Sequence, residues 1–391
     1  MIYAVWIVFV VSVFIPIYSY VIYPIIIKWK ASSVKPILQD YNLIKEWPEV
    51  TVVFSVFNEE KVIEKKLQSI FNSDYPKDKL KIIIGSDNST DKTHEIIESY
   101  IALHSNITLI KKHNRNGKLK IINELFDLVK TEHIVFTDAN VFFEPSTIKA
   151  LVYDLIINDA KLVCGNIHKF SPKNQGISGQ EILYMNYENS LKHYESLAYH
   201  FCVGVEGGCY AIKRDWFVKV PDGFLMDDFF ITLDVISKGA KVMFEPQALC
   251  YEDVNDAPMI EFKRKIRISL GNFRNLNYYK HLLFPIHKGF GFAFFSHKVL
   301  RWVTPFMLII SFVSALVLSF KIDFFNWITY TYALLILLPL LTIILEKIKL
   351  KIPIINALGH FVLMNFALLI GYFKYQFANQ ESAWQPPQRN V

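Results

Sequence analysis

The sequence predicts an α/β domain with a mostly parallel sheet, joined to membrane-spanning helices on both sides. Along residues 50–253, short β-type apolar runs alternate with helical patterns, as they do in βαβ units. Apolar segments long enough to cross a bilayer lie before and after this block. Hydrophobic residues make up 52% of the 391-residue chain, which is more than a single soluble core needs.

The first apolar segment, residues 2–27, has no charged side chain and exceeds the roughly 20 residues that span a hydrocarbon core. We therefore expect a transmembrane anchor over residues 1–27. A cleaved signal peptide is the alternative, but no positively charged region precedes the segment and no small-x-small cleavage site follows it. Positive loops stay inside, and lysines follow at once, at Lys28, Lys30 and Lys35. The next domain is therefore expected on the cytoplasmic side of the cell membrane.

The block after the anchor, residues 48–275, is expected to form this cytoplasmic domain. Strands are predicted at residues 50–57, 80–87, 107–112 and 133–140, and the helices between them at 60–72, 93–103 and 118–129. Two more strands are predicted at 161–170 and 241–253, on either side of a polar and aromatic stretch. The four cysteines lie here without a CxxC pair or metal-ligand spacing, so we expect reduced thiols in the core.

The last part of the chain is nearly continuous apolar sequence. Three transmembrane helices are predicted within residues 302–376, near 302–320, 324–345 and 353–373. Just before them, residues 285–301 mix phenylalanines with His297 and Lys298, as an interfacial amphipathic helix does. For the tail, residues 377–391, the number of spans predicts the outer side and the nearby basic residues the inner side. The net charge of +6 comes largely from basic residues beside the membrane and does not indicate nucleic-acid binding.

Acidic and amide clusters follow several of the predicted strands, at residues 86–91, 137–140 and 227–228. The carboxyl ends of strands are where open α/β sheets bind ligands. These clusters belong to a longer series of segments, which reads VVFSVFNEE, SDNSTD, NRNGK, FTDAN, EGGCYAIKR, MDDF, RKIR and SHKVLRW. The order and spacing of the series resemble the membrane-bound family 2 glycosyltransferases, the group that includes the cellulose, hyaluronan and poly-N-acetylglucosamine synthases.

The resemblance implies a Rossmann-like nucleotide-diphospho-sugar transferase domain of the GT-A type, with one N-terminal and about three C-terminal transmembrane helices. It also implies an inverting hexosyl transfer in cell-surface polysaccharide synthesis. The donor would be a nucleotide sugar, UDP-linked in our interpretation, and the acceptor a lipid or a glycan at the cytoplasmic face of the membrane. The expected partners are therefore the nucleotide sugar, this acceptor and the membrane, with no nucleic acid.

The turn after the first strand is expected to contact the nucleotide. By resemblance, Val56, Asn58 and Glu59 would contact the base and the ribose. The alternative from the residues alone is a helix N-cap at Asn58 with acidic residues in the first turn.

Two further residues are assigned to the donor by resemblance. Asp87 matches the residue that binds the uracil and ribose end, whereas Asp91 is interpreted mainly as a cap of the next helix. Lys118, after a glycine, matches a basic residue that contacts the nucleotide or its phosphates. A solvated lysine at a helix start is the alternative, because lysine is rarely buried.

A departing diphosphate needs its charge neutralised, and Mg²⁺ or Mn²⁺ does this with oxygen ligands. Asp138 and Asn140 lie two residues apart at the end of a predicted strand, so strand geometry would point both side chains the same way. In the family that this chain resembles, the second position is usually Asp. Asp138 is therefore the main expected metal ligand, and Asn140 a weaker one.

Glycosyl transfer also needs a group that takes the proton from the acceptor hydroxyl. By resemblance, Asp228 is this general base and Asp227 its acidic neighbour. Like charges this close raise at least one pKa, which suits a base working near neutral pH. The alternative is a helix with an acidic first turn.

The remaining implied residues concern the acceptor and the leaving group. Glu206, Gly207 and Gly208 match a segment that lies near the acceptor, where glycines allow close approach to the backbone. Arg264 and Arg267 stand where processive members of the family hold the diphosphate. Ile268 replaces the tryptophan of that motif, which weakens the case for processive synthesis.

Two other functions stay open at this point. A polyprenyl-phosphate glycosyltransferase would use the same fold for a single transfer. A non-catalytic scaffold or transporter is the alternative from another class. Apart from His360, no ionisable residue interrupts the last three spans, although ion pathways often require one.

Overall fold

The computed structural model of the chain contains two compact units, which are described separately. A globular unit is formed by residues 31–170 and 184–254, and a helical unit by residues 1–30, 171–183 and 255–379. The structure describes residues 2–34, 39–170, 177–253, 258–347 and 352–377. The predicted tail, residues 377–391, therefore lies outside the described residues except for its first position.

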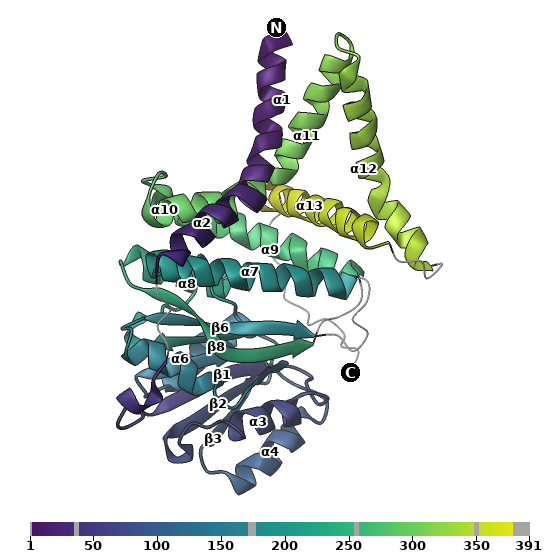
Figure 1. The fold of residues 1–391 in the computed structure, drawn as a ribbon. Helices are drawn as coiled ribbons and strands as arrows, with labels where there is room; N and C mark the ends of the chain where they lie inside the picture. Colours follow the sequence, from purple (N-terminus) through teal and green to yellow (C-terminus); the bar gives the residue numbers. More distant parts are fainter. Residues whose placement is uncertain (1, 35–38, 171–176, 254–257, 348–351, 378–391) are drawn as a thin grey trace. The chain divides into compact units, whose positions relative to one another are not determined.

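One sheet organises the globular unit, and its eight described strands run in the order β3-β2-β1-β4-β7-β6-β8-β5 (Figure 1). The strands are β1 Val50–Val56, β2 Leu80–Ser86, β3 Ile107–Lys111, β4 His133–Thr137, β5 Val141–Phe143, β6 Leu162–Phe170, β7 Cys209–Lys213 and β8 Val242–Asp253. The half from β3 to β4 is parallel. In the other half, β7 runs antiparallel to both β4 and β6, β8 is parallel to β6, and β5 is antiparallel to β8.

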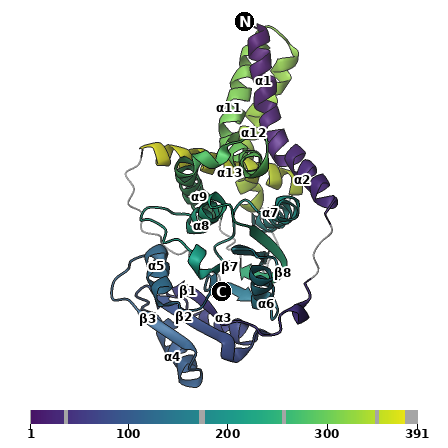
Figure 2. The same cartoon turned by 90° about the vertical axis from the view of Figure 1, so that its left-hand side faces the viewer.

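Helices cover both faces of the parallel half, which explains why its strands are near-continuous apolar runs. The helices of the globular unit are α3 Ile63–Phe71, α4 Thr93–Leu103, α5 Lys118–Leu128, α6 Thr147–Ile156, α8 Asp227–Ser237 and, shared with the helical unit, α7 Ile177–Tyr199. Three-residue 3-10 helices lie at Tyr41–Leu43, Lys77–Lys79 and Arg214–Trp216. Helix α5 packs on β1 and β2 (Figure 2) so closely that a Cβ on Gly85 would lie 2.4 Å from Cγ2 of Ile121.

The Rossmann-like α/β architecture predicted from the sequence is confirmed. The sheet is mostly parallel, as predicted, since four of the seven pairings between its described strands are parallel and the antiparallel ones involve only β7 and β5. The polar and aromatic stretch is more structured than expected, because it contains α7 and the antiparallel strand β7.

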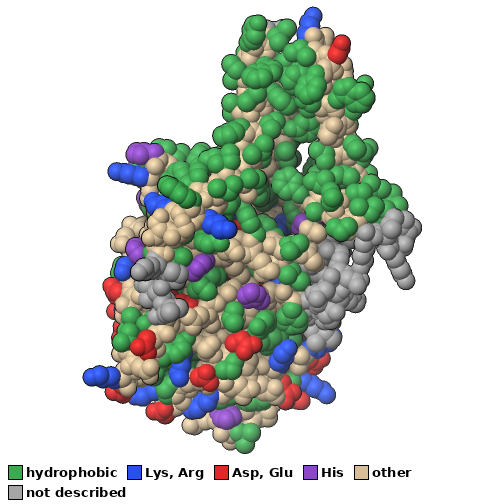
Figure 3. Space-filling model, viewed as in Figure 1, with side chains coloured by type: hydrophobic (Ala, Val, Ile, Leu, Met, Phe, Trp, Pro, Cys, Tyr) green, Lys and Arg blue, Asp and Glu red, His purple; other side chains and the backbone are tan. Residues whose placement is uncertain are grey.

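The helical unit contains four helices that are long and apolar enough to cross a membrane, counted over the described residues. The first runs from Ile2 to Ser32 through α1 Ile2–Ile17, a π-helix Tyr18–Ile22 and α2 Tyr23–Ser32. The third and fourth lie within α12 Phe324–Lys347 and α13 Pro353–Phe377. Hydrophobic side chains cover most of the face of α1, α11 and α12 that Figure 3 shows.

The second candidate span includes most of the segment that was predicted as an interfacial helix, residues 285–301. It runs unbroken from Gly289 to Ser319, through α10 Gly289–Ala293, a π-helix Phe294–Val299 and α11 Leu300–Ser319. Residues 289–301 therefore begin the same continuous helix that α11 completes, and their place at a membrane interface stays a prediction. Phe294 and His297 within this segment are buried. Before this span, α9 Pro258–Tyr278 leads into a 3-10 helix at Lys280–Leu283.

The two π-helices pack against each other. The hydroxyls of Tyr18 and Ser296 lie 3.1 Å apart, and the Ser19 hydroxyl donates to the carbonyl of Ser296 over 2.9 Å. Single π turns inside α-helices are frequent at functional sites. Here the Ser19 hydroxyl satisfies the backbone carbonyl of Ser296, and the contact between the Tyr18 and Ser296 hydroxyls joins the same two segments.

Candidate active site

The candidate site lies at the carboxyl ends of β1, β2 and β4, in the globular unit. Strand β7 is antiparallel to β4, so the loop before β7 reaches the same edge, where Thr137 pairs with Cys209. The carboxyl ends of neighbouring parallel strands are where open α/β sheets bind ligands. The sheet topology therefore brings most of the predicted residues to one edge.

The turn after β1 is held to the turn after β2 by side chains. Asn58 has a left-handed backbone, with φ of 52°, and its Oδ1 accepts a hydrogen bond of 2.8 Å from the Thr90 N–H. The N–H of Glu59 donates to the Thr93 hydroxyl over 2.8 Å. The carbonyl of Val56 accepts from the Asp87 N–H. These three predicted nucleotide contacts are thus close together, and the Asn58 amide also has a structural role.

Asp87 is buried and organises the loop before α5. Its carboxylate accepts hydrogen bonds from the N–H groups of Asn116, at 2.7 Å, and Gly117, at 3.0 Å. Arg115 lies 3.4 Å from the same carboxylate and 3.5 Å from the centre of the Phe57 ring. Gly117 has φ of 84°, a value that favours glycine. Asp87 therefore fixes the loop that brings Lys118 to the site.

Lys118 and Asp138 form an ion pair in which Nζ lies 2.5 Å from Oδ1. Both side chains are partly exposed. Burial alone would lower the pKa of Lys118, but the carboxylates of Asp138, Asp227 and Asp228 outweigh it and raise the pKa. The predicted metal ligand, the predicted phosphate contact and the two predicted catalytic residues thus share one electrostatic environment.

Asn140 is placed differently from the expectation. Strand β4 ends at Thr137 and β5 begins at Val141, so residues 138–140 form a turn and strand alternation does not apply to them. The Asn140 side chain donates from Nδ2 to Oε1 of Glu252 on β8, over 3.3 Å. Glu252 therefore stands next to the Asp138 turn, which sequence spacing could not show.

Asp228 lies at the start of α8 and is buried, whereas Asp227 is half-buried. Oδ2 of Asp228 accepts a hydrogen bond from the N–H of Gly207 over 2.8 Å, and Oδ1 of Asp228 accepts one from the Phe229 N–H over 2.7 Å. Burial, and then Asp227 and Glu206, raise the pKa of Asp228 to about 7, against the lowering effect of Lys118. A carboxyl with this pKa can exchange a proton near neutral pH.

The Glu206–Gly208 loop lies between Asp138 and Asp228. A Cβ on Gly207 would lie 3.0 Å from Oδ2 of Asp228, and one on Gly208 would lie 3.0 Å from Cγ2 of Val141. Glycine is therefore needed here for close approach. Glu206 pairs with Lys192, a buried lysine on α7.

Arg264 and Arg267 lie on α9, which belongs to the helical unit. Arg264 pairs with Glu261 over 3.1 Å, and the neighbouring Lys265 lies 3.5 Å from Glu181. Their role toward a diphosphate stays a prediction.

Sequence reasoning missed two buried lysines, Lys66 and Lys192. Lys66 is on the core face of α3, in a stripe with Ile63, Leu67 and Ile70. A charged residue at an apolar position of an amphipathic helix was a usable signal, since buried lysines need partners.

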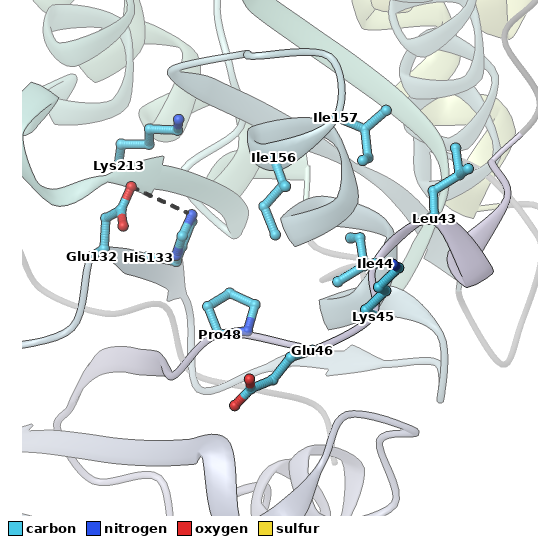
Figure 4. A pocket seen from close by; sticks show the side chains of 10 residues that line it. All are labelled: Leu43, Ile44, Lys45, Glu46, Pro48, Glu132, His133, Ile156, Ile157 and Lys213. Carbon is cyan, nitrogen blue, oxygen red and sulfur yellow. Dashed lines mark ion pairs between the residues drawn. The ribbon is translucent and has the colours of Figure 1, made fainter.

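The structure also has a pocket of about 500 Å³ at the opposite edge of the sheet (Figure 4). Its lining includes His133 at the start of β4, Pro48 before β1 and Lys213 at the end of β7. Because β1 and β4 present their amino ends here, this pocket is distinct from the candidate site.

Two family models match the chain. Glycosyl transferase family 2 matches residues 51–220, and glycosyl transferase family group 2 matches residues 168–345. The chain belongs to glycosyltransferase family 2. The sequence-based resemblance is thus confirmed at the level of the family, and the chain carries the domains of a glycosyltransferase.

The relatives of this family 2 glycosyltransferase are distant. The Bacillus subtilis protein YdaM, described as a probable glycosyltransferase, is 27% identical over 241 residues, 59% of this chain and 56% of YdaM. The Methanococcus voltae dolichyl N-acetyl-alpha-D-glucosaminyl phosphate 3-beta-D-2,3-diacetamido-2,3-dideoxy-beta-D-glucuronosyltransferase is 27% identical over 216 residues, 50% of this chain and 64% of that protein. The matches thus span less than two thirds of either relative.

A solved structure shares the whole fold of this glycosyltransferase. The mannosyltransferase PcManGT from Pyrobaculum calidifontis, in complex with GDP-Man and Mn²⁺, matches with a TM-score of 0.70 at 19% identity. The match covers 95% of this chain and 99% of that one. The predicted GT-A fold is therefore confirmed.

Proposed function

We propose that this enzyme transfers a sugar from a nucleotide-sugar donor, UDP-linked, to a lipid-linked or polysaccharide acceptor, and that Asp228 is the general base. The observation that carries the proposal is the setting of Asp228. It is buried, held by Gly207 of the proposed acceptor loop, and has a pKa raised to about 7. A base near the acceptor loop with this pKa fits deprotonation of a sugar hydroxyl.

The reaction would be a single displacement. The acceptor oxygen attacks the anomeric carbon, and the bond from that carbon to the diphosphate oxygen breaks. The nucleoside diphosphate leaves with the electron pair, while Asp228 takes the hydroxyl proton. Because one displacement inverts the carbon, an α-linked donor would give a β-linked product. Asp227 adds negative charge beside the base and helps to raise its pKa.

For the donor, the turn with Val56, Asn58 and Glu59 and the loop ordered by Asp87 would bind the nucleoside. Lys118 would contact the diphosphate, because its ammonium group lies 2.5 Å from Asp138, the residue proposed to hold the metal ion. Arg264 and Arg267 are proposed to hold the departing diphosphate by paired hydrogen bonds.

A divalent cation, Mg²⁺ or Mn²⁺, fits the donor set at this edge. Asp138 would hold it, with Asn140 as a weaker ligand, and both offer the oxygen atoms that such ions prefer. Within the described residues, no group of three or more His, Cys, Asp or Glu is arranged to hold a metal ion. A site that takes its remaining ligands from diphosphate and water would agree with this. When bound, the ion would neutralise charge on the leaving diphosphate.

The four apolar helices support a place in the membrane, and the lysines that follow the first one favour a cytoplasmic catalytic domain. A nucleotide sugar is available on that side, and a lipid or a growing glycan would meet the enzyme at the bilayer. The name of the Methanococcus voltae relative includes a dolichyl-linked acceptor, which supports this class.

The test uses purified full-length protein in lipid, with a panel of labelled UDP- and GDP-sugars and a lipid extract as the acceptor source. We expect transfer from a UDP-sugar to a product that needs the extract, and loss of transfer in Asp228→Asn. Transfer from GDP-sugars alone would contradict the donor class. Equal transfer by Asp228→Asn, or inactive Asp227→Asn beside active Asp228→Asn, would contradict the assignment of the base.

A second candidate is a single transfer to a polyprenyl phosphate. Ile268, in place of the stacking tryptophan, favours it, because an aliphatic side chain gives a terminal sugar less specific contact. A labelled product that moves entirely into the organic phase and carries one sugar would support this candidate.

A further inference from the structure

Lys66 is a fully buried lysine that none of the proposed chemistry uses. It lies on α3, and its neighbours on the same helix face, Ile63, Leu67 and Ile70, are apolar and also buried. Water solvates an ammonium group strongly, so placing it in a core is unfavourable unless it is hydrogen-bonded there. The partners of Lys66 therefore indicate what its burial achieves.

The ammonium group ties together the two ends of one turn. It donates to the Thr137 hydroxyl over 2.8 Å and to the Val141 carbonyl over 2.5 Å. It also lies 3.7 Å from the centre of the Phe143 ring, a favourable position for a cation. Thr137 and Val141 flank residues 138–140, the turn that carries the proposed metal ligands. Lys66 thus holds the two ends of this turn together from the buried side.

Thr137 links Lys66 to the Glu206–Gly208 loop by hydrogen bonds. Since its oxygen accepts from Lys66, its own proton is donated to the Gly208 carbonyl, over 2.8 Å. The N–H of Asp138 points to the same carbonyl, at 3.3 Å. One residue earlier, Gly207 holds Asp228. Hydrogen bonds therefore run from Lys66 through Thr137 to the loop that anchors the proposed base.

We propose that Lys66 is a positioning residue for glycosyl transfer, which fixes the Asp138 turn and the Glu206–Gly208 loop relative to each other through Thr137 and Val141. This inference rests on the proposed function, because it takes the roles of Asp138 and Asp228 from there. A residue of this kind touches no substrate and acts through the geometry of those that do.

The energetics separate this role from a role in folding. Burial lowers the pKa of Lys66 to about 7, although Cys209, Cys250 and Asp138 oppose the shift. The charged form is thus disfavoured in the folded protein, and an apolar side chain of similar length would suit the core at least as well. Replacing buried charged groups by apolar ones is often neutral or stabilising. Loss of activity without loss of stability is therefore the signature of positioning.

The experiment compares Lys66→Met with Lys65→Met in the full chain in lipid. Lys65 is the exposed neighbour on the same helix, so it controls for the loss of one lysine. We expect kcat of Lys66→Met to fall on the order of 10²-fold, as small misplacements of reacting groups do, with little change in donor KM or Tm. Lys65→Met should match the wild type.

A substitution pair at Thr137 tests the route. Thr137→Val removes the hydroxyl and should lower kcat, whereas Thr137→Ser keeps it and should restore most of the rate. The double variant Lys66→Met with Thr137→Val should be little worse than Lys66→Met alone, because both break one connection. Multiplying effects would overturn the proposal. So would wild-type kcat in Lys66→Met, or activity that falls only in step with the folded fraction.

Hydrogen exchange gives a readout that does not depend on transfer. In Lys66→Met, amide exchange of residues 138–141 and 206–209 should speed up together, and in Lys65→Met, which loses a contact with the Phe142 ring, it should not. Unchanged exchange in both segments would overturn the positioning role even if transfer is never observed. A wild-type enzyme that is inactive toward all donors, with this exchange effect present, would instead contradict the proposed function alone.

Discussion

The backbone N–H of Gly207 donates a hydrogen bond of 2.8 Å to Oδ2 of Asp228, so the acceptor loop and the proposed base form one structural piece. The acceptor hydroxyl and the group that deprotonates it would therefore be positioned by the same contact. This coupling also favours glycine at position 207, because a Cβ there would lie only 3.0 Å from the Asp228 carboxylate.

Asp228→Asn should separate catalysis from binding. The amide keeps the shape of the carboxyl but does not accept a proton, so kcat should fall by about 10²- to 10⁴-fold. Donor affinity, measured by isothermal titration calorimetry, should barely change. Asp127→Asn, at an exposed ion pair with Lys219, serves as a control and should keep the wild-type rate.

The pH dependence of kcat should follow from the raised pKa of Asp228, about 7. A general base works only when deprotonated, so kcat should rise with pH through about 7 and level off above it. Glu206→Gln removes one of the charges that raise this pKa, so the midpoint should move to lower pH. A profile that falls across this range would contradict a base and point to an acid.

Removal of divalent metal should stop transfer. A chelator should abolish it, added Mn²⁺ or Mg²⁺ should restore it, and Asp138→Ala should not respond to either ion. Asn140→Asp adds a charged oxygen ligand, so it should keep or tighten metal binding measured by calorimetry. Full transfer in excess chelator would remove the metal from the mechanism.

Product length should report on Ile268. Without an aromatic platform at that position we expect short or single additions, measured by gel or mass spectrometry. Arg267→Ala should lower turnover with any acceptor, because the departing diphosphate loses a cationic clamp as its charge develops. Long polymer without released intermediates would show that another aromatic side chain holds the growing end.

A buried carboxyl pair away from the site predicts a pH effect on stability. Burial, and then Asp154, raise the pKa of Glu245 to about 9. The folded protein then holds a proton that the unfolded chain releases above about pH 4.5, so stability falls as pH rises through this window. Glu245→Gln removes this loss, so its Tm should exceed the wild-type Tm at pH 8 and approach it at pH 5.

The parts of the fold that the sequence predicted share one physical cause. Where a segment buries one face, the apolar period reveals it, and the helix predicted at 93–103 matches α4 Thr93–Leu103. Asp87, Asp138 and Asp228 could be found because acidic residues stand out at the ends of such segments. Asp87 and Asp138 lie at one edge because they follow β2 and β4 in the parallel half of the sheet. Asp228 lies at the same edge because it is hydrogen-bonded to Gly207, in the loop before β7.

The rest depended on contacts between distant residues. Helix α7 carries Glu188, Lys192 and Glu195 on its buried side, so it lacks the apolar stripe that identifies a packed helix. Strand β7 enters between β4 and β6 in the antiparallel direction, an arrangement set by the whole sheet and not by its own five residues. Asn140 faces Glu252, which is 112 positions away in the chain.

Strand β7 runs antiparallel to β4, and this change of direction separates most residues proposed for the donor from those proposed for the acceptor. Apart from Arg264 and Arg267, the residues proposed for the donor follow the parallel strands up to β4, whereas the acceptor loop leads into β7. Among the described strands, the ladder from His133–Lys213 to Thr137–Cys209 joins β4 to β7, and the pairing of β5 with β8 adds a second link. We therefore expect that a graft which replaces the β7 side of the sheet and keeps these pairings would change the acceptor preference, while the nucleoside preference stays with the recipient.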